Sequence, residues 1–241
     1  MKSFIIDKIE RYLSYKIPAM FKFFKKKKKI KANLHSVTIP DQGWIRVSED
    51  KEAIRWVNQQ QSALIVLHFF DKDPDLPTAQ DLDYLKKFYR NIAAASNGGT
   101  IETDIIHVHN IPCVKTIIKI PQQETGMAYI ASITIPFENC SYVVKIQANE
   151  IGITGMRDAL ILDRLHKAGE VEMDEETMKN WFEDPYDPDF KEGTLMNKSE
   201  LEKYDHEFPE HPLSIARSLI RSIAATIIFK KEIKELPSFK K

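Results

Sequence analysis

Two histidines in the middle of the chain are spaced as a pair of metal ligands would be. His107 and His109 lie two residues apart in a segment with the apolar alternation of a strand, so both side chains would point to the same face. Cys113 or an acidic residue would have to complete the site, because zinc takes three or four protein ligands. No third or fourth ligand stands at a workable spacing. We therefore interpret the histidines as surface residues and expect no metal and no other cofactor.

A carboxylate-rich stretch is the next candidate for chemistry. Three aspartates lie within six residues, at Asp184, Asp187 and Asp189. Calcium takes oxygen ligands from such loops, but the D-x-[DN]-x-[DN]-G pattern of a calcium loop is absent. Aspartate before proline is common in turns, and Pro185 and Pro188 follow the first two aspartates. We interpret the stretch as a turn-forming loop.

Two polar pairs precede predicted helices, and each has a functional and a structural interpretation. Arg157 and Asp158 begin one helix, where free backbone N–H groups could hold an anion. The phosphate-loop patterns are missing, and Asp158 in a first turn simply favours the helix. His211 and Ser214 lie close together before the last helix, but no GxSxG turn presents a nucleophile. We assign both pairs to helix starts and predict no catalytic residue.

The N-terminal residues combine an amphipathic pattern with a strong positive charge. Residues 1–31 contain ten lysines and one arginine against Asp7 and Glu10, a net charge of 11 − 2 = +9. Apolar residues recur in steps of three and four, which predicts one helical face that Pro18 should break or kink. These residues are Ile5, Ile9, Tyr12, Leu13, Ile17, Met20, Phe21 and Phe24. An unbroken basic run follows, made of Lys25, Lys26, Lys27, Lys28 and Lys29.

This basic segment is the candidate binding site of the chain, and several contacts are open to it. With Ile5, Ile9, Leu13 and Phe21 toward lipid and the lysines toward anionic headgroups, it could lie on a membrane surface. It could equally dock into the groove of a partner protein or form a disordered tail. It could also pack on residues 170–210 of its own chain, where four lysines face fifteen acidic residues, a net charge of 4 − 15 = −11.

Bulk composition excludes several classes of protein. The 241 residues are 43% apolar, which is ample for one large domain, and the net charge of zero gives no sign of a nucleic-acid binder. No run approaches eighteen apolar residues, and the N-terminus lacks the pattern of a signal peptide. Two cysteines, Cys113 and Cys140, form no CxxC pair. We expect a cytoplasmic protein, peripheral at the inner face of the membrane if the basic segment binds there. A disulfide between Cys113 and Cys140 on neighbouring strands is an alternative that the sequence leaves undecided.

The elements that would position these residues centre on four consecutive strands within residues 100–150. Their connections are too short for parallel crossovers, so the strands must form antiparallel hairpins. Residues 63–70 read as a buried strand, and residues 78–96 and 154–167 read as helices, the second with Thr154 as its N-cap. The pattern predicts an α+β fold: a mainly antiparallel, twisted sheet flanked by helices. We divide the chain into a basic helix and linker (1–33), a sandwich core (34–169), an acidic wrapping loop (170–211) and a C-terminal helix packed on the core (212–241).

Several short stretches resemble the PsbP-like superfamily of α/β/α sandwiches. They are the opening Ile39-Pro40-Asp41-Gln42-Gly43-Trp44, the helix exit Gly98-Gly99-Thr100, and the hairpin formed by residues 114–120 and 127–135. The similarity spans about residues 34–168. That group includes an extrinsic photosystem II subunit, a nuclear-import Ran-binding factor and many bacterial proteins without an assigned role. The resemblance implies a non-enzymatic binding module and carries no catalytic or ligand residue onto this chain.

Three functions follow from these patterns. The first is a non-catalytic module that binds a protein partner and is tethered to the membrane periphery by its basic helix. The second is an immunity or inhibitor protein that uses its acidic segment against a basic toxin. The third is a metal-dependent hydrolase built on His107, His109 or the carboxylate-rich loop. We favour the first, in which the protein is not an enzyme.

Overall fold

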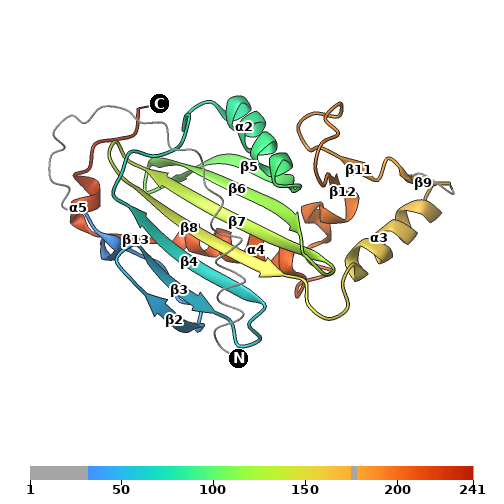
Figure 1. Ribbon diagram of the computed structural model, residues 1–241, viewed down its shortest axis with the longest axis horizontal. Helices are drawn as coiled ribbons and strands as arrows, with labels where there is room; N and C mark the ends of the chain where they lie inside the picture. Colours follow the sequence, from blue (N-terminus) through green and yellow to red (C-terminus); the bar gives the residue numbers. More distant parts are fainter. Residues whose placement is uncertain (1–31, 175–177, 241) are drawn as a thin grey trace.

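The centre of the molecule is one seven-stranded sheet in which every neighbouring pair of strands is antiparallel (Figure 1). The computed structural model describes residues 32–174 and 178–240. In spatial order the strands are β2 (Ile45–Glu49), β3 (Ala53–Val57), β4 (Ala63–Phe70), β8 (Ser141–Asn149), β7 (Met127–Pro136), β6 (Ile111–Pro121) and β5 (Gly99–Val108). Helices flank this sheet, so the predicted α+β class is confirmed.

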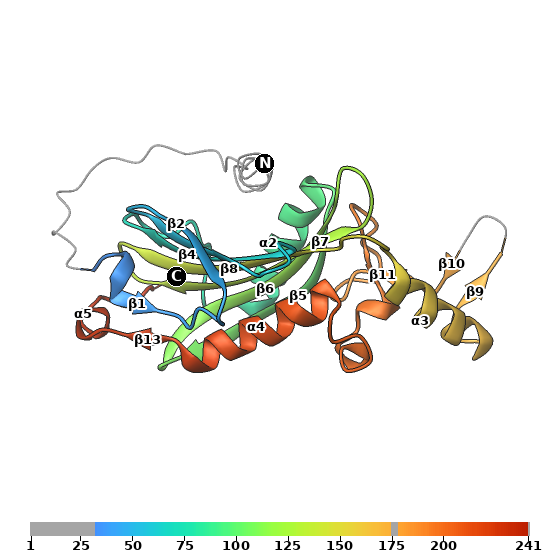
Figure 2. The same cartoon turned by 90° about the horizontal axis from the view of Figure 1, so that it is seen from below.

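Two long helices cover opposite faces of the sheet (Figure 2). They are α2 (Leu82–Ala95), over β5 and β6, and α4 (Pro212–Thr226), under β7 and β8. A third helix, α3 (Met156–Lys167), extends away from one end of the sheet. Within the described residues no helix is long and apolar enough to cross a bilayer.

The four predicted central strands are β5 to β8, and the register between them is set by tight turns. The β5–β6 turn consists of His109 and Asn110, both with positive φ (47° and 66°), as a two-residue type I′ turn requires. Strand β5 therefore ends at Val108, and His109, which the sequence analysis placed in the strand, belongs to the turn. Pattern reading also omitted β3, a five-residue strand that pairs with β4 through the register Trp56↔Ile65.

The face covered by α4 holds the main core. Alternate residues of the central strands point to this face, because side chains alternate across a strand. They include Ile65 and Leu67 of β4 and Val144 and Ile146 of β8, all at most 1% exposed. The apolar stripe predicted for the last helix packs on them: Leu213, Ala216, Ile220 and Ile223 are buried, and Leu219 and Ala224 are partly buried.

The opposite face is only partly covered by α2. Leu85 of this helix packs with Val114 of β6, Leu76 and Ala79. The helix begins later than the pattern predicts, because the Asp81 side chain accepts a hydrogen bond from the Tyr84 N–H and caps it. Farther across the same face, β3, β4 and β8 present polar side chains: Arg55, His68, Lys145, Gln147 and Asn149.

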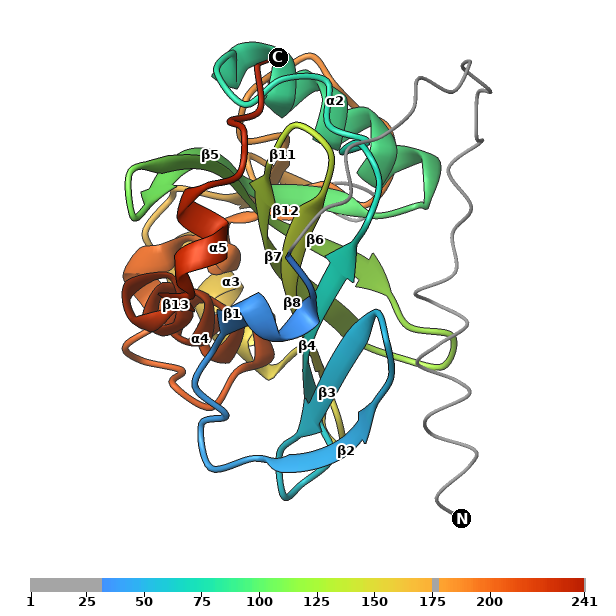
Figure 3. The same cartoon turned by 90° about the vertical axis from the view of Figure 1, so that its left-hand side faces the viewer.

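Short elements tie the two ends of the described chain together (Figures 2 and 3). The 3₁₀ helix η1 (Leu34–Ser36) and β1 (Val37–Thr38) lie beside β13 (Ile228–Phe229) and α5 (Lys231–Lys234). Between α3 and α4 the chain forms the short strands β9 (Glu172–Met173), β10 (Met178–Lys179), β11 (Phe182–Glu183) and β12 (Met196–Asn197), then the 3₁₀ helices η2 (Lys198–Glu200) and η3 (Glu202–Tyr204). The acidic segment thus contains regular structure.

Candidate binding site

The two histidines proposed as metal ligands do not share a face. His107 lies exposed in β5, whereas His109 sits in the following turn, with Nε2 2.8 Å from the Ile227 carbonyl oxygen and its ring against Phe229. Cys113 is fully buried, and burial raises the pKa of its thiol to about 12. In the described part of the chain, no group of three or more His, Cys, Asp or Glu residues could hold a metal.

The carboxylate-rich loop is held by an arginine of α2. Arg90 lies 2.7 Å from Asp187 and 3.8 Å from Asp184. Each of these aspartates also caps its own turn, because Asp184 accepts from the Tyr186 N–H and Asp187 accepts from the Asp189 N–H. These contacts agree with the turn-forming interpretation, and they dock the loop on α2.

Arg157 is buried within the protein and does not face an external anion. Its guanidinium donates hydrogen bonds at 2.8–3.2 Å to the backbone carbonyls of Ser199 and Leu201, the Ser214 hydroxyl and Asp205. The neighbouring Asp158 accepts from the Ser199 hydroxyl and from the Asn197 side-chain amide. Thr154 does not cap α3; the N-cap is Gly155, whose φ is +73°. The Arg157–Asp158 pair therefore fastens residues 197–205 to the start of α3.

A buried ion pair continues this network onto the sheet. Glu200, 0% exposed, lies 2.7 Å from Lys119 of β6, 1% exposed. Glu200 also accepts from the Tyr129 hydroxyl at 3.0 Å. Burial raises the pKa of Tyr129, and the negative charge of Glu200 raises it further. Arg217 of α4 completes the network through Glu102, Asp205 and the Glu200 carbonyl oxygen. Every charge in this cluster has a partner, which is typical of a structural network.

The proposed His–Ser pair is engaged in other contacts. Ser214 accepts from Arg157, and His211 accepts from the Leu213 N–H as the N-cap of α4. The other ring nitrogen of His211 lies 3.5 Å from Glu150. The sequence-based assignment of both residues to a helix start agrees with these contacts.

Glu150 organises the loop between β8 and α3. Its two carboxylate oxygens accept hydrogen bonds from the N–H groups of Met127 (2.8 Å) and Gly155 (3.0 Å). Burial alone would raise the pKa of Glu150, but the nearby His211 ring and the hydrogen bonds from these two N–H groups outweigh burial and lower it. The carboxylate therefore ties the start of a short loop, residues 150–155, to its last residue and to the start of β7.

Four exposed apolar side chains lie close together in sequence on this loop and on the first turns of α3. The fractional exposures are 61% for Ile151, 80% for Ile153, 52% for Met156 and 52% for Leu160. We call these four residues the apolar tip. The opposite side of α3 is buried, with Ile161 at 0% and Leu165 at 5%. Helical spacing places Met156 and Leu160 on one outward face.

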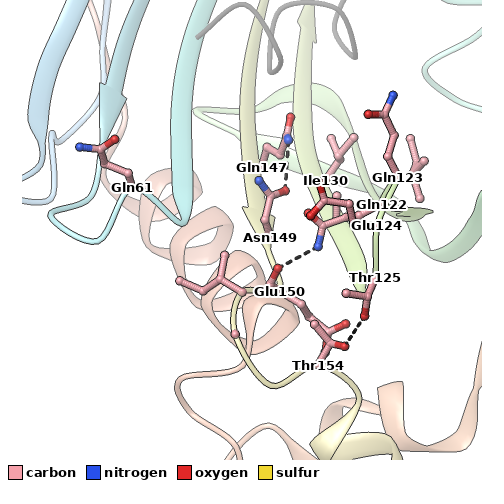
Figure 4. Close-up of a pocket in the computed structure, with 14 residues that line it drawn as sticks. Gln61, Gln122, Gln123, Glu124, Thr125, Ile130, Gln147, Asn149, Glu150 and Thr154 are labelled. Carbon is pink, nitrogen blue, oxygen red and sulfur yellow. Dashed lines mark hydrogen bonds between the residues drawn. The ribbon is translucent and has the colours of Figure 1, made fainter. Parts of the chain in front are cut away.

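A cavity lies on each side of the loop, and both share Asn149, Glu150 and Ile151. The first, of about 400 Å³, opens on the sheet face that carries Gln147 and Asn149; Gln122 and Thr125 border it from the β6–β7 turn (Figure 4). The second, of about 550 Å³, lies between the loop and the start of α4.

Sequence reasoning missed this site. The available signal was Ile151-Gly152-Ile153, two isoleucines around a glycine in a short connection where polar residues are usual. The candidate residues that the sequence did supply, Ile5, Ile9, Leu13, Phe21 and lysines 25–29, lie outside the described residues. Their role stays a prediction.

No family model and no curated protein matches the chain. Among solved structures it is similar to the Ran-binding protein Mog1p of Saccharomyces cerevisiae, at 9% identity and a TM-score of 0.37 over 54% of this chain and 78% of that one. It is also similar to the cyanobacterial PsbP of Synechocystis, at 10% identity and 0.32 over 53% and 79%. A third similar structure is a Pseudomonas aeruginosa protein of unknown function, at 11% identity and 0.30 over 68% and 96%.

The similar structures include PsbP and Mog1p, members of the group that the sequence resembles. At TM-scores of 0.30–0.37, the resemblance to this group stays a prediction from the sequence. Sequence identities of 9–11% support no inference about function. No partner or activity of those proteins follows for this chain.

Proposed function

We propose that the protein is a non-catalytic module that binds another protein through the apolar tip. The observation that carries this proposal is the exposure of Ile151, Ile153 and Met156 on adjoining turns of one loop and helix. Single exposed apolar residues are ordinary, but a contiguous group rimmed by polar residues is typical of an interaction site. The adjacent cavity of about 550 Å³, between the loop and the start of α4, offers room for partner side chains.

The tip is also held firmly enough to act as a binding surface. Glu150 fixes the loop ends through two backbone N–H groups, and the Arg157 network fixes the start of α3. A preformed surface loses little conformational entropy on binding, which favours affinity. Docking of the tip would remove several large apolar side chains from water, each contributing up to about 1.5–3 kcal/mol.

Site-specific photocrosslinking tests the proposal. A benzophenone amino acid at position 153 should give a discrete adduct in cells of the native organism, and Ile151→Asp with Met156→Asp should abolish it. The matched control is the same probe at position 228, an isoleucine that is 62% exposed at the other end of the molecule. Equal adduct patterns from positions 153 and 228 would contradict the assignment.

The peripheral membrane tether remains a second part of the proposal, supported by the sequence of residues 1–31. Each lysine near an anionic surface contributes about 1 kcal/mol, and salt screens this attraction. The full chain should float with anionic vesicles, bind neutral vesicles less, and dissociate at high salt. Replacing lysines 25–29 by glutamine should lower the bound fraction. Equal binding to both vesicle types, or to neither, would contradict a tether.

An inhibitor role for the acidic segment receives less support. Many of its carboxylates are already paired inside the protein: Asp184 and Asp187 with Arg90, Asp205 with Arg157 and Arg217, and Glu207 with Arg164. Fewer charges therefore face outward than the net count of −11 suggests. The metal-dependent hydrolase is favoured by no contact among the described residues.

A further inference from the structure

The smaller of the two cavities contains a buried side-chain amide whose carbonyl oxygen lacks a hydrogen-bond donor. Gln147 of β8 is 5% exposed and faces the cavity of about 400 Å³ (Figure 4). Its Nε2 donates to Asn149 Oδ1 at 3.1 Å, whereas its Oε1 is buried and accepts no hydrogen bond. A buried carbonyl oxygen without a donor destabilises the fold, so its place in a cavity wall calls for an explanation.

The surrounding sheet does not supply the missing donor. The cross-strand neighbours of Gln147 are Leu64 on β4 and Ile130 on β7, and neither side chain can donate a hydrogen bond. In sequence terms an apolar residue would fit this position on the sheet. Glutamine there satisfies only one of its two polar groups with the protein itself.

Two further polar side chains of the cavity, Gln122 and Glu150, limit what would fit. Gln122 Nε2 donates to two carbonyl oxygens, those of Met127 and Glu150, so its remaining side-chain group is the acceptor Oε1. The Glu150 carboxylate is occupied by backbone N–H groups. Ile120, Ala128 and Ile130 add apolar surface to the wall. No Lys, Arg or His is among the described residues that line the cavity, so an anion would lack a counter-charge.

We propose that this cavity, the amide pocket, binds a small neutral molecule that carries amide or hydroxyl groups on a partly apolar body. A donor of this ligand satisfies Gln147 Oε1, and a second donor reaches Gln122 Oε1. The volume of about 400 Å³ suits a ligand of the size of a monosaccharide or a capped dipeptide. The pocket shares Ile151 with the apolar tip, and its other lining residues lie outside the tip.

Nuclear magnetic resonance on the full-length chain tests the proposal. The probes are N-acetylglucosamine, which presents hydroxyls with one amide, and acetylglutamine methylamide, which presents amides alone; citrate is the anionic control. A neutral probe should shift the Gln147 and Gln122 side-chain resonances in a saturable manner, and citrate should not. Binding of only the sugar or only the peptide identifies which source supplies the shared chemistry, and binding of both supports the class as stated.

Variants separate the pocket from general stability. Gln147→Met keeps the size of the side chain and removes its acceptor, so the affinity should fall at least about tenfold while Tm stays at or above that of the parent. Gln59→Met, the same change at an exposed glutamine, should bind like the parent. If Gln147→Met does not fold, Ala128→Leu, which narrows the pocket floor, takes its place and should block binding.

Three outcomes would overturn the proposal: no shift with either neutral probe, a citrate shift at the same residues, or undiminished affinity in the pocket variants. The proposal can fail while photocrosslinking at position 153 succeeds, and the reverse also holds, because the readouts involve different residues.

Discussion

The two faces of the sheet differ in how they treat polar groups. On the face under α4, the central strands present apolar residues, and the charged residues at its margin, Lys119 and Glu200, satisfy each other at 2.7 Å. On the opposite face, β4 and β8 present His68, Lys145 and Gln147, and the side-chain oxygen of Gln147 is buried without a hydrogen-bond donor. Both faces belong to the same strands, so the contrast arises from side-chain alternation alone.

This difference separates stability from binding. The α4 face supplies most of the buried apolar surface, and its few charges are fully hydrogen-bonded. The opposite face keeps groups that would prefer water: burial lowers the pKa of His68 to about 4, and burial also lowers the pKa of Lys145. Costly groups of this kind are common at functional sites. We expect substitutions on the first face to unfold the protein, and those on the second face to change binding.

The largest effect should come from a charge placed in the α4 core. Ile223 is 0% exposed on the buried stripe of the helix. Ile223→Asp should cost about 5 kcal/mol, because an unpaired carboxylate is buried, and this is comparable to total stability. Urea denaturation followed by circular dichroism measures the loss. Ile228→Asp, at a residue 62% exposed, is the control and should unfold at the same urea concentration as the parent. An unfolding free energy of Ile223→Asp equal to that of the parent would mean that α4 does not support the core.

The buried ion pair should give the next largest effect. Glu200→Leu leaves the Lys119 ammonium buried without a partner, which costs about 3 kcal/mol or more. Adding Lys119→Met should recover part of the loss, because it removes the unpaired ammonium, whereas the Tyr129 hydroxyl and the Asn197 N–H still lack the acceptor that Glu200 supplied. The exposed pair Arg164–Glu207 is the comparison, and Glu207→Leu should change stability little. If the double variant were less stable than Glu200→Leu, the paired charges would contribute more than burial of apolar groups does.

These two regions also show how far the sequence could lead. The period of 3.6 residues in α4 and the short connections of β5–β8 predicted the apolar stripe and the antiparallel sheet, because both depend on local pattern. Strand β3 was missed, since Ala53–Val57 is a strand through its pairing with both β2 and β4. His109 was placed in a strand because an asparagine turn can begin one residue earlier than its sequence suggests.

The candidate site could not be predicted in the same way. Arg157 and Glu200 look like exposed charges in the sequence, and only contacts with residues more than 40 positions away bury them. The amide pocket depends on the register Gln147↔Ile130, which no local pattern encodes. The apolar tip had a local signal in Ile151 and Ile153, but their exposure is visible only when the fold is known.

A pH titration should reveal the half-buried His68 of the second face. His68 has a pKa lowered to about 4 by burial and by the nearby Lys145 and Arg55, whereas Asp50 opposes this shift. The unfolded chain binds a proton near pH 6.5 and the folded chain does not, so stability falls as pH drops through this window. The loss should reach about 2 kcal/mol between pH 7.5 and 5.

Urea denaturation at several pH values measures this slope. His68→Gln should flatten it, because the side chain no longer titrates in the unfolded state. His107→Gln, at an exposed histidine, should leave the slope as it is in the parent. An unchanged slope in His68→Gln would show that His68 stays hydrated in the folded protein.

The smallest expected effect is the change in stability of Gln147→Met, on the sheet face opposite α4. If Gln147 Oε1 is a buried acceptor without a donor, Gln147→Met should raise the free energy of unfolding by about 1 kcal/mol in the absence of ligand. Most substitutions of buried residues destabilise, so a gain would be diagnostic of a group kept for binding. Thr116→Val is the matched comparison on the same face, because the Thr116 hydroxyl is already hydrogen-bonded to Ser132 at 2.8 Å, and its removal should destabilise. Opposite signs for two polar-to-apolar changes on one sheet face would separate a satisfied polar group from an unsatisfied one. A loss of stability in Gln147→Met as large as that in Thr116→Val would instead mean that Gln147 is held by the protein, and the amide pocket would lose its main argument.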